Sequence, residues 1–316
     1  MRRYLARRVL AAGMVVFAVS CLVFFVLHLI PGDPAQVLLG PTATSQDLLR
    51  LRHELGLDRS VPVQYLTWMA HVARGDFGWS YVLRRPVLPE VAERFAHTLI
   101  LAGGAMIIAF PLGILLGSWA ASRRGTFVDR LSTVVASIGI SMPSFWVGVL
   151  LIVLFSVRLR WLPGSGMYSP TGEGGGLDLL VHLVLPAITL ALVPLAIITR
   201  MMRTTLVEVL REDYMRTARA KGLSEAPALM RHGLPNAFIP LVTLLGFQVG
   251  QLLAGGVYVE TVFSWPGVGQ LLVNAILTRD IPIVQGSILL VATTYVIINL
   301  ATDLLYAVLD PRLRYG

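Results

Sequence analysis

Charged residues and cysteine are both scarce in this chain of 316 residues. Only 14% of the residues are charged, against about a quarter in a typical soluble domain, and 55% belong to the apolar set. The single cysteine, Cys21, excludes a disulfide framework and any zinc or iron–sulfur site that needs several cysteines. A chain this apolar and this poor in charge is typical of a membrane protein, not of a soluble globule, a disordered chain or a coiled coil.

Catalytic signatures are missing as well. The only lysine, Lys221, is flanked by Ala220 and Gly222, so the sequence has no G-x-x-x-x-G-K-[ST] loop to cradle nucleotide phosphates. The patterns G-x-S-x-G, H-E-x-x-H and C-x-x-C are also absent. The sequence therefore predicts no catalytic residue, no cofactor-binding residue and no metal site in this chain.

Long apolar runs are what the sequence does contain. A helix needs roughly 20 residues to cross about 30 Å of hydrocarbon. Six charge-free runs reach this length: 9–30, 98–122, 131–157, 179–199, 233–259 and 281–302. They predict an all-α membrane protein with six transmembrane helices. The first run resembles a signal peptide at Ala18–Cys21, but it is longer than a typical signal sequence, so we expect it to be retained.

The net charge of +8 is distributed unevenly between the segments that separate these runs. The N-terminus carries +4, and the segments 123–130 and 200–232 carry +2 and +3. The segments 31–97 and 158–178 are neutral, and 260–280 carries −1. Because positively charged loops stay in the cytoplasm, this alternation predicts that both termini and the segments 123–130 and 200–232 are cytoplasmic. The neutral or negative segments 31–97, 158–178 and 260–280 are predicted to face outside.

The outer segment 31–97 predicts a small helical cap. Its helical patterns cover residues 46–56, with Ser45 as the N-cap and Gly56 as the C′ residue, and residues 63–72. The outer segments 158–178 and 260–280 are expected to be loops, the first of them irregular because it is rich in glycine, serine and proline.

The cytoplasmic segment 200–232 is dense in helix-forming residues. The pattern predicts a helix over 208–221, a left-handed turn at Gly222, and a short helix over 225–232 that Ser224 caps and Pro235 ends. Such a hairpin fits docking to a partner protein, and it fits equally a solvated hairpin or a binder of lipid headgroups.

Few ionisable residues lie inside the apolar runs. Asp303 follows Asn299 by four positions and precedes Tyr306 by three, so the three side chains share one face of a helix. We favour a hydrogen-bonded cluster between helices over a role in gating or substrate binding. A proton- or sodium-coupled carrier usually buries more ionisable groups, so energy coupling is expected to come from elsewhere unless the protein is a passive pore.

The segment 200–232 resembles the coupling loop of the permease subunits of binding-protein-dependent ABC importers. The general signature fits only in part, at Ala218, Gly222 and Leu234-Pro235. The dipeptide/oligopeptide/nickel permease family fits better, because its version of the loop resembles Glu212-Asp213-Tyr214 and the run from Thr217 to Leu223. Motifs at both ends and in the outer segments extend the similarity over nearly the whole chain, and the long first outer segment suits the B-type member of a permease pair.

This resemblance implies a fold, a function and partners. The fold would be that of a type I ABC importer permease, with six helices, a small helical outer loop and a cytoplasmic coupling-helix hairpin at 200–235. The chain would pair with a second, homologous permease, dock on two ATPase subunits that bind ATP and Mg, and receive solute from an extracytoplasmic binding protein. It would lie in the bacterial or archaeal inner membrane as half of a path for di- or oligopeptides, nickel chelates or glutathione-like solutes.

The resemblance also nominates functional residues. The coupling residues would be Glu212, Asp213, Tyr214, Arg216, Ala218, Arg219, Ala220, Lys221, Gly222 and Leu223. The outer candidates are Asp33, Asp76, Glu260, Pro266 and Gly267. By segment, the chain divides into a first helix (1–30), an outer loop (31–97), a five-helix core (98–309) and a tail (310–316). A stand-alone channel or carrier, and a scaffold that anchors a cytoplasmic enzyme, remain the alternatives.

Overall fold

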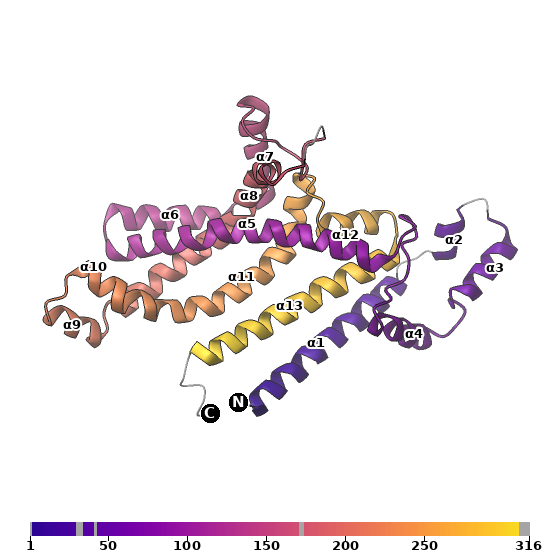
Figure 1. Cartoon of the computed structure of the whole chain (residues 1–316), viewed down its shortest axis with the longest axis horizontal. Coiled ribbons are helices and arrows are strands. Elements are labelled where there is room, and N and C mark those ends of the chain that lie inside the picture. Colours follow the sequence, from indigo (N-terminus) through magenta and orange to yellow (C-terminus); the bar gives the residue numbers. More distant parts are fainter. Residues whose placement is uncertain (1, 30–33, 41–42, 171–173, 310–316) are drawn as a thin grey trace. The chain divides into compact units, whose positions relative to one another are not determined.

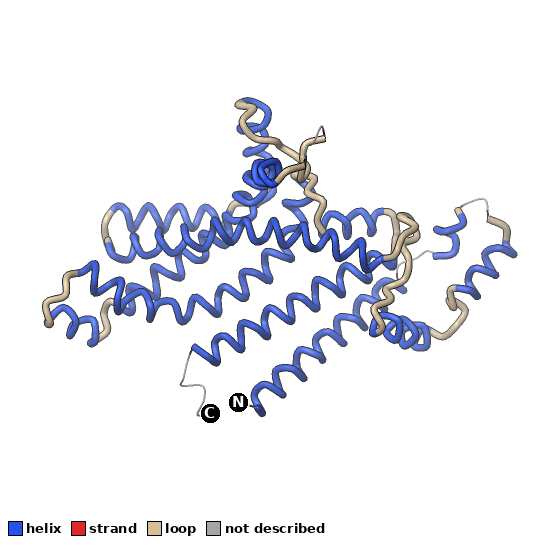
Figure 2. Tube along the Cα trace, in the orientation of Figure 1, coloured by secondary structure: helices blue, strands red, loops and turns tan. Residues whose placement is uncertain are grey.

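The structure, a computed structural model, describes residues 2–29, 34–40, 43–170 and 174–309. About 80% of the described residues are helical, and none of them lies in a strand, as Figure 2 shows. The helices, labelled in Figure 1, are α1 (Arg2–Leu29), α2 (Pro34–Leu39), α3 (Ser45–Glu54), α4 (Val61–Ala73), α5 (Val87–Ser122), α6 (Phe127–Ser141), α7 (Ser144–Leu151), the π-helix η1 (Ile152–Arg158), α8 (Gly176–Val209), α9 (Asp213–Ala220), α10 (Glu225–Ala228), the π-helix η2 (Leu229–Gly233), α11 (Leu234–Val262), α12 (Val268–Leu277) and α13 (Ile281–Leu309).

Several of these helices are long and apolar enough to cross a membrane. Four of them qualify alone: α1, α5, α8 and α13. Two bent pairs raise the number to as many as six if each pair forms one span. The fold is therefore that of a helical membrane protein with four to six spans.

The apolar run 131–157 does not form one continuous helix. The α6 helix ends at Ser141, and the following pair of α7 and η1 leaves it at 98°, a turn that is visible in Figure 1. Met142 has the extended angles φ −79° and ψ 131° that a residue before proline prefers, and Pro143 has no backbone N–H to continue the helix. Pro186 and Pro194, by contrast, lie inside the continuous helix α8.

The chain forms two compact units. The first comprises the described residues of 1–98 and 266–297, and the second those of 99–265 and 298–316. In the second unit, α8 carries many of the buried residues, including Ile198, Met202 and Leu206. Glycines of α5 allow α8 to approach: a Cβ on Gly117 would lie 2.6 Å from the carbonyl oxygen of Thr199. Side chains larger than hydrogen do not fit at this position.

The first unit has its own apolar core. It joins the start of α5, the helix α12 and the start of α13, through Val87, Val91, Val268, Ala275 and Ile283. The sequence pattern predicts no helix within the outer segment 260–280, so α12 is a feature that the structure adds. A hydroxyl from far along the chain caps this helix, because the backbone N–H of Val268 donates to Thr98 Oγ1 at 2.9 Å.

The outer cap follows the sequence pattern closely. The helices α3 and α4 occupy the expected positions, and Gly56 has φ +66° after α3. The N-cap of α3 is Thr44, not Ser45: Thr44 Oγ1 accepts the backbone N–H of Asp47 at 3.3 Å. The α4 helix packs on α1, where the Tyr65 hydroxyl lies 2.8 Å from Ser20 Oγ.

A rigid turn precedes α5 in the first unit. Asp280, 2% exposed, accepts hydrogen bonds from the hydroxyl of Ser80 and from the backbone N–H groups of Tyr81 and Val82. Burial, with a smaller effect from the Asp280 charge, raises the pKa of Tyr81 to about 12, so its phenol stays protonated. A carboxylate that accepts several bonds from one segment fixes the conformation of that segment.

Candidate functional site: the cytoplasmic hairpin

The hairpin that follows α8 contains all ten predicted coupling residues. The structure replaces the expected helix over 208–221 with two pieces: α8 ends at Val209, and α9 begins at Asp213 with Glu212 as its N-cap residue. Figure 1 labels α9 and α10 on either side of the turn that joins them.

A Schellman motif ends α9. The N–H of Gly222 donates to the carbonyl of Arg219 at 2.9 Å, and the N–H of Leu223 donates to that of Ala218 at 3.2 Å. Gly222 has φ +88°, which confirms the predicted left-handed turn. Because residues with a Cβ avoid this conformation, glycine is the residue that this turn requires.

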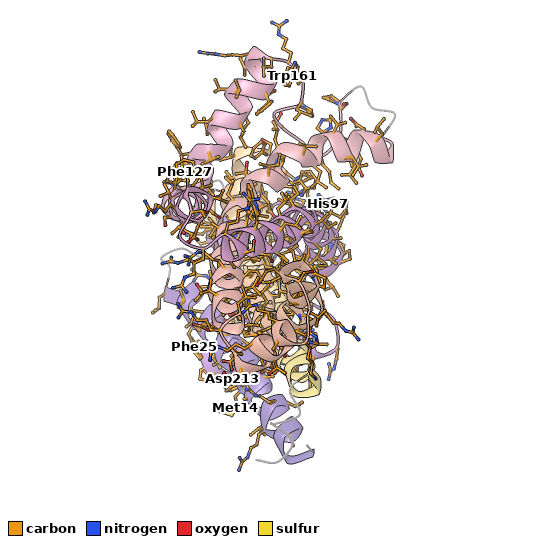
Figure 3. The ribbon with its side chains drawn as sticks, turned by 90° about the vertical axis from the view of Figure 1, so that its left-hand side faces the viewer. Met14, Phe25, His97, Phe127, Trp161 and Asp213 are labelled. Carbon is orange, nitrogen blue, oxygen red and sulfur yellow. The ribbon has the colours of Figure 1, made fainter. Side chains whose placement is uncertain are left out.

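The α9 helix has one buried and one exposed face. Met215 is fully buried and Ala218 is 7% exposed, so these two residues anchor the helix to the rest of the unit. The opposite face presents charge: Arg216 pairs with Asp213, which Figure 3 labels, at 3.3 Å, and both side chains are largely exposed. The helix is therefore held from one side and offers a polar surface on the other.

Tyr214 lies at the edge of the exposed face. Its side chain is partly exposed, and burial together with the charge of Glu212 raises the pKa of the phenol. An interaction with Asn236, at the start of α11, lowers the pKa of the same phenol.

Arg219 joins three parts of the hairpin. Its Nε lies 2.9 Å from Glu225 Oε1 and its Nη2 donates to Glu225 Oε2 at 3.2 Å, which makes a two-pronged ion pair between α9 and α10. Its Nη1 also reaches the carbonyl oxygen of Leu210 at 3.5 Å. Arg219 thus holds the two short helices together and to the segment after α8.

The second half of the hairpin differs from the sequence-based prediction. The expected helix 225–232 is a single α-turn, α10, followed by the π-helix η2. Ser224 is the N-cap residue, yet no capping hydrogen bond comes from its side chain. Pro235 does not end a helix: it lies in the first turn of α11, directly after the π-helix η2. Gly233, in the π-helix η2, lies against Leu206 of α8. A Cβ added to Gly233 would be 3.4 Å from Leu206 Cδ1.

The other candidates belong to other segments of the chain than the hairpin. Asn299 and Asp303 are half-buried on α13, and Tyr306 lies on the same helix, but its side chain is outside the described ones. Asp33 also lies outside the described residues. Asp76 is exposed, and hydrogen bonds from the N–H of Gly78 and from His71 lower the pKa of its carboxyl group.

The expected position of Glu260 in an outer loop is wrong. Glu260 lies in the last turn of α11 and is fully buried, because α11 continues to Val262. Pro266 and Gly267 do lie in a loop, where Gly267 is the N-cap residue of α12 and the carbonyl oxygen of Pro266 lies 3.0 Å from His97 Nδ1.

The comparisons with known proteins cover almost the whole chain. Residues 113–315 match the family of binding-protein-dependent transport system inner membrane components, and residues 1–102 match the N-terminal region of such a membrane component. Glutathione transport system permease proteins named GsiC, from Salmonella paratyphi A and from Escherichia coli K12, are each 44% identical over 315 residues and aligned over 100% of both chains. The chain belongs to this family of importer permeases.

A solved structure shares the fold of this permease. A chain of the methionine ABC transporter MetNI, in inward-facing conformations, matches with a TM-score of 0.51 and 19% identity, over 71% of this chain and 96% of that one. The permease is thus a membrane-spanning subunit of a binding-protein-dependent importer, and such a subunit is not itself the ATPase. The missing nucleotide loop of the sequence agrees with this assignment.

Sequence reasoning missed one charged pair in the permease. Asp129 of α6 and Arg203 of α8 are joined by a short ion pair, although 74 positions separate them. In the sequence, the two charges contribute only to the loop charges that predict orientation. The signal that could have indicated the pair is that an acidic and a basic residue each border an apolar run on the side predicted to be cytoplasmic.

Proposed function

We propose that this chain is one of two permeases around the path of an ATP-driven importer, and that the hairpin 212–223 transmits the movement of the ATPases to the spanning helices. Each bent pair counts as one span, which gives six spans with both termini in the cytoplasm. The observation that carries the proposal is the doubly secured hairpin. The Schellman turn at Gly222 and the ion pair of Arg219 with Glu225 make it stiff enough to push on α8 and α11.

The partners follow from the family. A second, homologous permease would complete the path, two ATPase subunits would bind the exposed face of α9, and a binding protein would deliver solute from outside. ATP and Mg would bind only in the ATPases. Rigid-body movement of the docked hairpin would then alternate the access of the path.

The solute is proposed to be a di- or oligopeptide, including glutathione-like tripeptides. This proposal is supported by relatives that are 44% identical over the full length and are named for glutathione transport. Among the outer candidates, Asp76, Pro266 and Gly267 are proposed to contribute to the surface that meets the binding protein. Asn299, Asp303 and Tyr306 are proposed to pack against other helices.

A reconstitution tests this function. The permease pair, the ATPases and the binding protein are placed in proteoliposomes, and uptake of labelled glutathione and of glycyl-leucine is measured with and without ATP. ATP-dependent uptake of either solute is expected. Uptake by the purified chain alone, without ATP, would overturn the proposal in favour of a channel or carrier.

A pair of glycine variants tests the hairpin. Gly222 has φ +88° and Gly125, in the loop between α5 and α6, has φ +77°, and an added Cβ would meet no atom within 4 Å at either position. Gly222→Val and Gly125→Val therefore impose a similar backbone strain. We expect Gly222→Val to reduce solute-stimulated ATP hydrolysis at least about tenfold and Gly125→Val to change it little. Equal effects would argue against a coupling role.

A further inference from the structure

A pocket of about 370 Å³ lies between the segment 163–169 and the first two turns of α8. It is lined by Pro163, Ser169, Leu177, Asp178, Val181 and His182. All six residues belong to the second unit. The volume is in the range of sites that hold small molecules.

The wall of this pocket is held in place at two points. The N–H of Gly166 donates to the carbonyl oxygen of Phe263 at 2.8 Å. Ser169 donates from both its N–H and its hydroxyl to the carboxylate of Asp178, each at 2.8 Å. The segment 163–169 is therefore a fixed wall opposite α8.

His182 supplies a buried nitrogen to the pocket. Its side chain is 6% exposed, and its Nδ1 lies 2.9 Å from the carbonyl oxygen of Asp178 and 3.2 Å from the Asp178 carboxylate. These acceptors assign the proton to Nδ1. With the proton on Nδ1, Nε2 on the far edge of the ring carries a lone pair that accepts a hydrogen bond, and within the described part of the chain no residue bonds to Nε2.

The chemistry of the lining selects the ligand. The Asp178 carboxylate and the Nε2 lone pair both accept hydrogen bonds, and the six lining residues include no lysine or arginine. Pro163, Leu177 and Val181 provide apolar contact. An anion would be repelled by the carboxylate, and a quaternary ammonium would have no N–H to donate. A primary ammonium on a short aliphatic body satisfies both acceptors and the apolar wall.

We propose that this pocket binds a primary ammonium group, and that the amino end of a peptide-like solute supplies it. The inference rests on the proposed function, in which the segment 158–178 faces the side where solute arrives. The headgroup of an aminophospholipid carries the same group, so the experiment separates the two sources.

The test uses the complete permease–ATPase complex without its binding protein. The complex is placed in nanodiscs of phosphatidylglycerol and phosphatidylcholine, whose headgroups carry no primary ammonium. Binding of glycyl-leucine and of N-acetyl-glycyl-leucine is measured by saturation-transfer NMR. We expect the free dipeptide to bind at least about tenfold more tightly than the acetylated one, because acetylation removes the charge-assisted hydrogen bonds.

Two variants and one matched control locate the binding. Asp178→Asn removes the charge, and Val181→Phe fills the pocket while every polar group stays in place. Each is expected to weaken dipeptide binding about tenfold. Asp58→Asn alters another histidine–aspartate pair, His53–Asp58, which is exposed, and is expected to have no effect. Equal binding of the two dipeptides, or binding that both pocket variants leave unchanged, would overturn the inference.

Further arms distinguish the remaining outcomes. If phosphatidylethanolamine in the nanodisc displaces the dipeptide from the wild type, the ammonium pocket is supported and the solute as its occupant is overturned. ATP-driven uptake is measured in parallel with the binding protein present. If ATP-driven uptake is intact but the free and the acetylated dipeptide bind equally well, the inference about the pocket is overturned and the proposed function stands. Discrimination without any ATP-dependent uptake supports the pocket and counts against the proposed function.

Discussion

Arg203 of α8 donates two hydrogen bonds to the carboxylate of Asp129 in α6, from Nε at 2.5 Å and from Nη2 at 3.0 Å. The same carboxylate accepts the backbone N–H of Gly125 at 2.9 Å. Asp129 is nearly buried, whereas Arg203 keeps about a third of its side chain in contact with solvent. One carboxylate thus fixes both the loop before α6 and the position of that helix on α8.

This pair predicts a strong energetic coupling. Asp129→Asn is expected to lower the free energy of unfolding by about 3 kcal/mol, because it leaves a partly buried guanidinium without its counter-charge. Arg203→Gln should cost a similar amount. The double variant should cost less than the two single costs combined, with a coupling energy of about 1.5–3 kcal/mol. Unfolding in detergent, followed by circular dichroism, measures all four proteins.

An exposed ion pair serves as the control for this double-mutant cycle. Arg216 and Asp213 form an exposed pair at 3.3 Å, for which a coupling energy of only about 0.2–1 kcal/mol is expected. Additive costs at Asp129 and Arg203 would mean that the two residues stabilise the protein independently.

Gly117 of α5 predicts a steric limit at the contact with α8. A methyl group there would lie 2.6 Å from the Thr199 carbonyl oxygen and 2.7 Å from the Cβ of Met202. Gly117→Ala should therefore destabilise the protein by about 1–3 kcal/mol. Gly103 lies on the same helix with no atom within 4 Å of an added Cβ, so Gly103→Ala should be neutral or stabilise by up to about 1 kcal/mol. Thermal unfolding of the two variants checks the contrast, which would disappear if α5 and α8 did not pack this closely.

Apolar run length predicted the straight spans well. The helices α1, α5, α8 and α13 include the expected runs almost entirely, since a helix satisfies its backbone polar groups within the segment, as an apolar run in lipid requires. Run length could not separate Pro143, which follows the end of α6, from Pro186 and Pro194, which lie inside the continuous helix α8. After the break, α7 makes a contact that run length does not indicate: a Cβ added to Gly148 would lie 3.1 Å from Phe263.

In the cytoplasmic segment, the local sequence pattern predicted the glycine turn but not the features that depend on contacts between distant residues. The glycine turn at Gly222 follows from residue type alone, and the structure confirms it. The break in the helix at 210–212 and the π-helix η2 were not predicted. Arg219 reaches the Leu210 carbonyl at the break, and Gly233 of η2 lies against Leu206, and local propensity indicates neither contact. The helix α12 was missed for a related reason, because its N-terminal cap comes from Thr98.

Replacing Arg219 is expected to make the backbone amides of the hairpin exchange faster with solvent. Arg219→Ala removes the ion pair with Glu225 and the bond to the Leu210 carbonyl, so α9 and α10 should separate more often. The pair is partly exposed and is worth about 1 kcal/mol at most, which corresponds to roughly fivefold faster amide exchange at Lys221–Leu223. Arg216→Ala, on the exposed face of the same helix, should leave this exchange unchanged. Equal exchange in the two variants would show that Arg219 does not hold the helices together.

Asp76 predicts a pH dependence in the outer cap. The N–H of Gly78 and then His71 stabilise its charged form, so its folded pKa lies below the ordinary 3.8. The stabilisation of the turn after α4 is therefore complete above about pH 4 and is lost as the pH falls through the lowered pKa. Carbon-13 NMR of labelled aspartate should give a midpoint below 3.8 for Asp76. His71→Gln should raise that midpoint only in part, since the bond from Gly78 remains, whereas His53→Gln should move Asp58 instead. If the Asp76 midpoint did not change in His71→Gln, the contact at 2.9 Å between the imidazole and the carboxylate would not persist in solution.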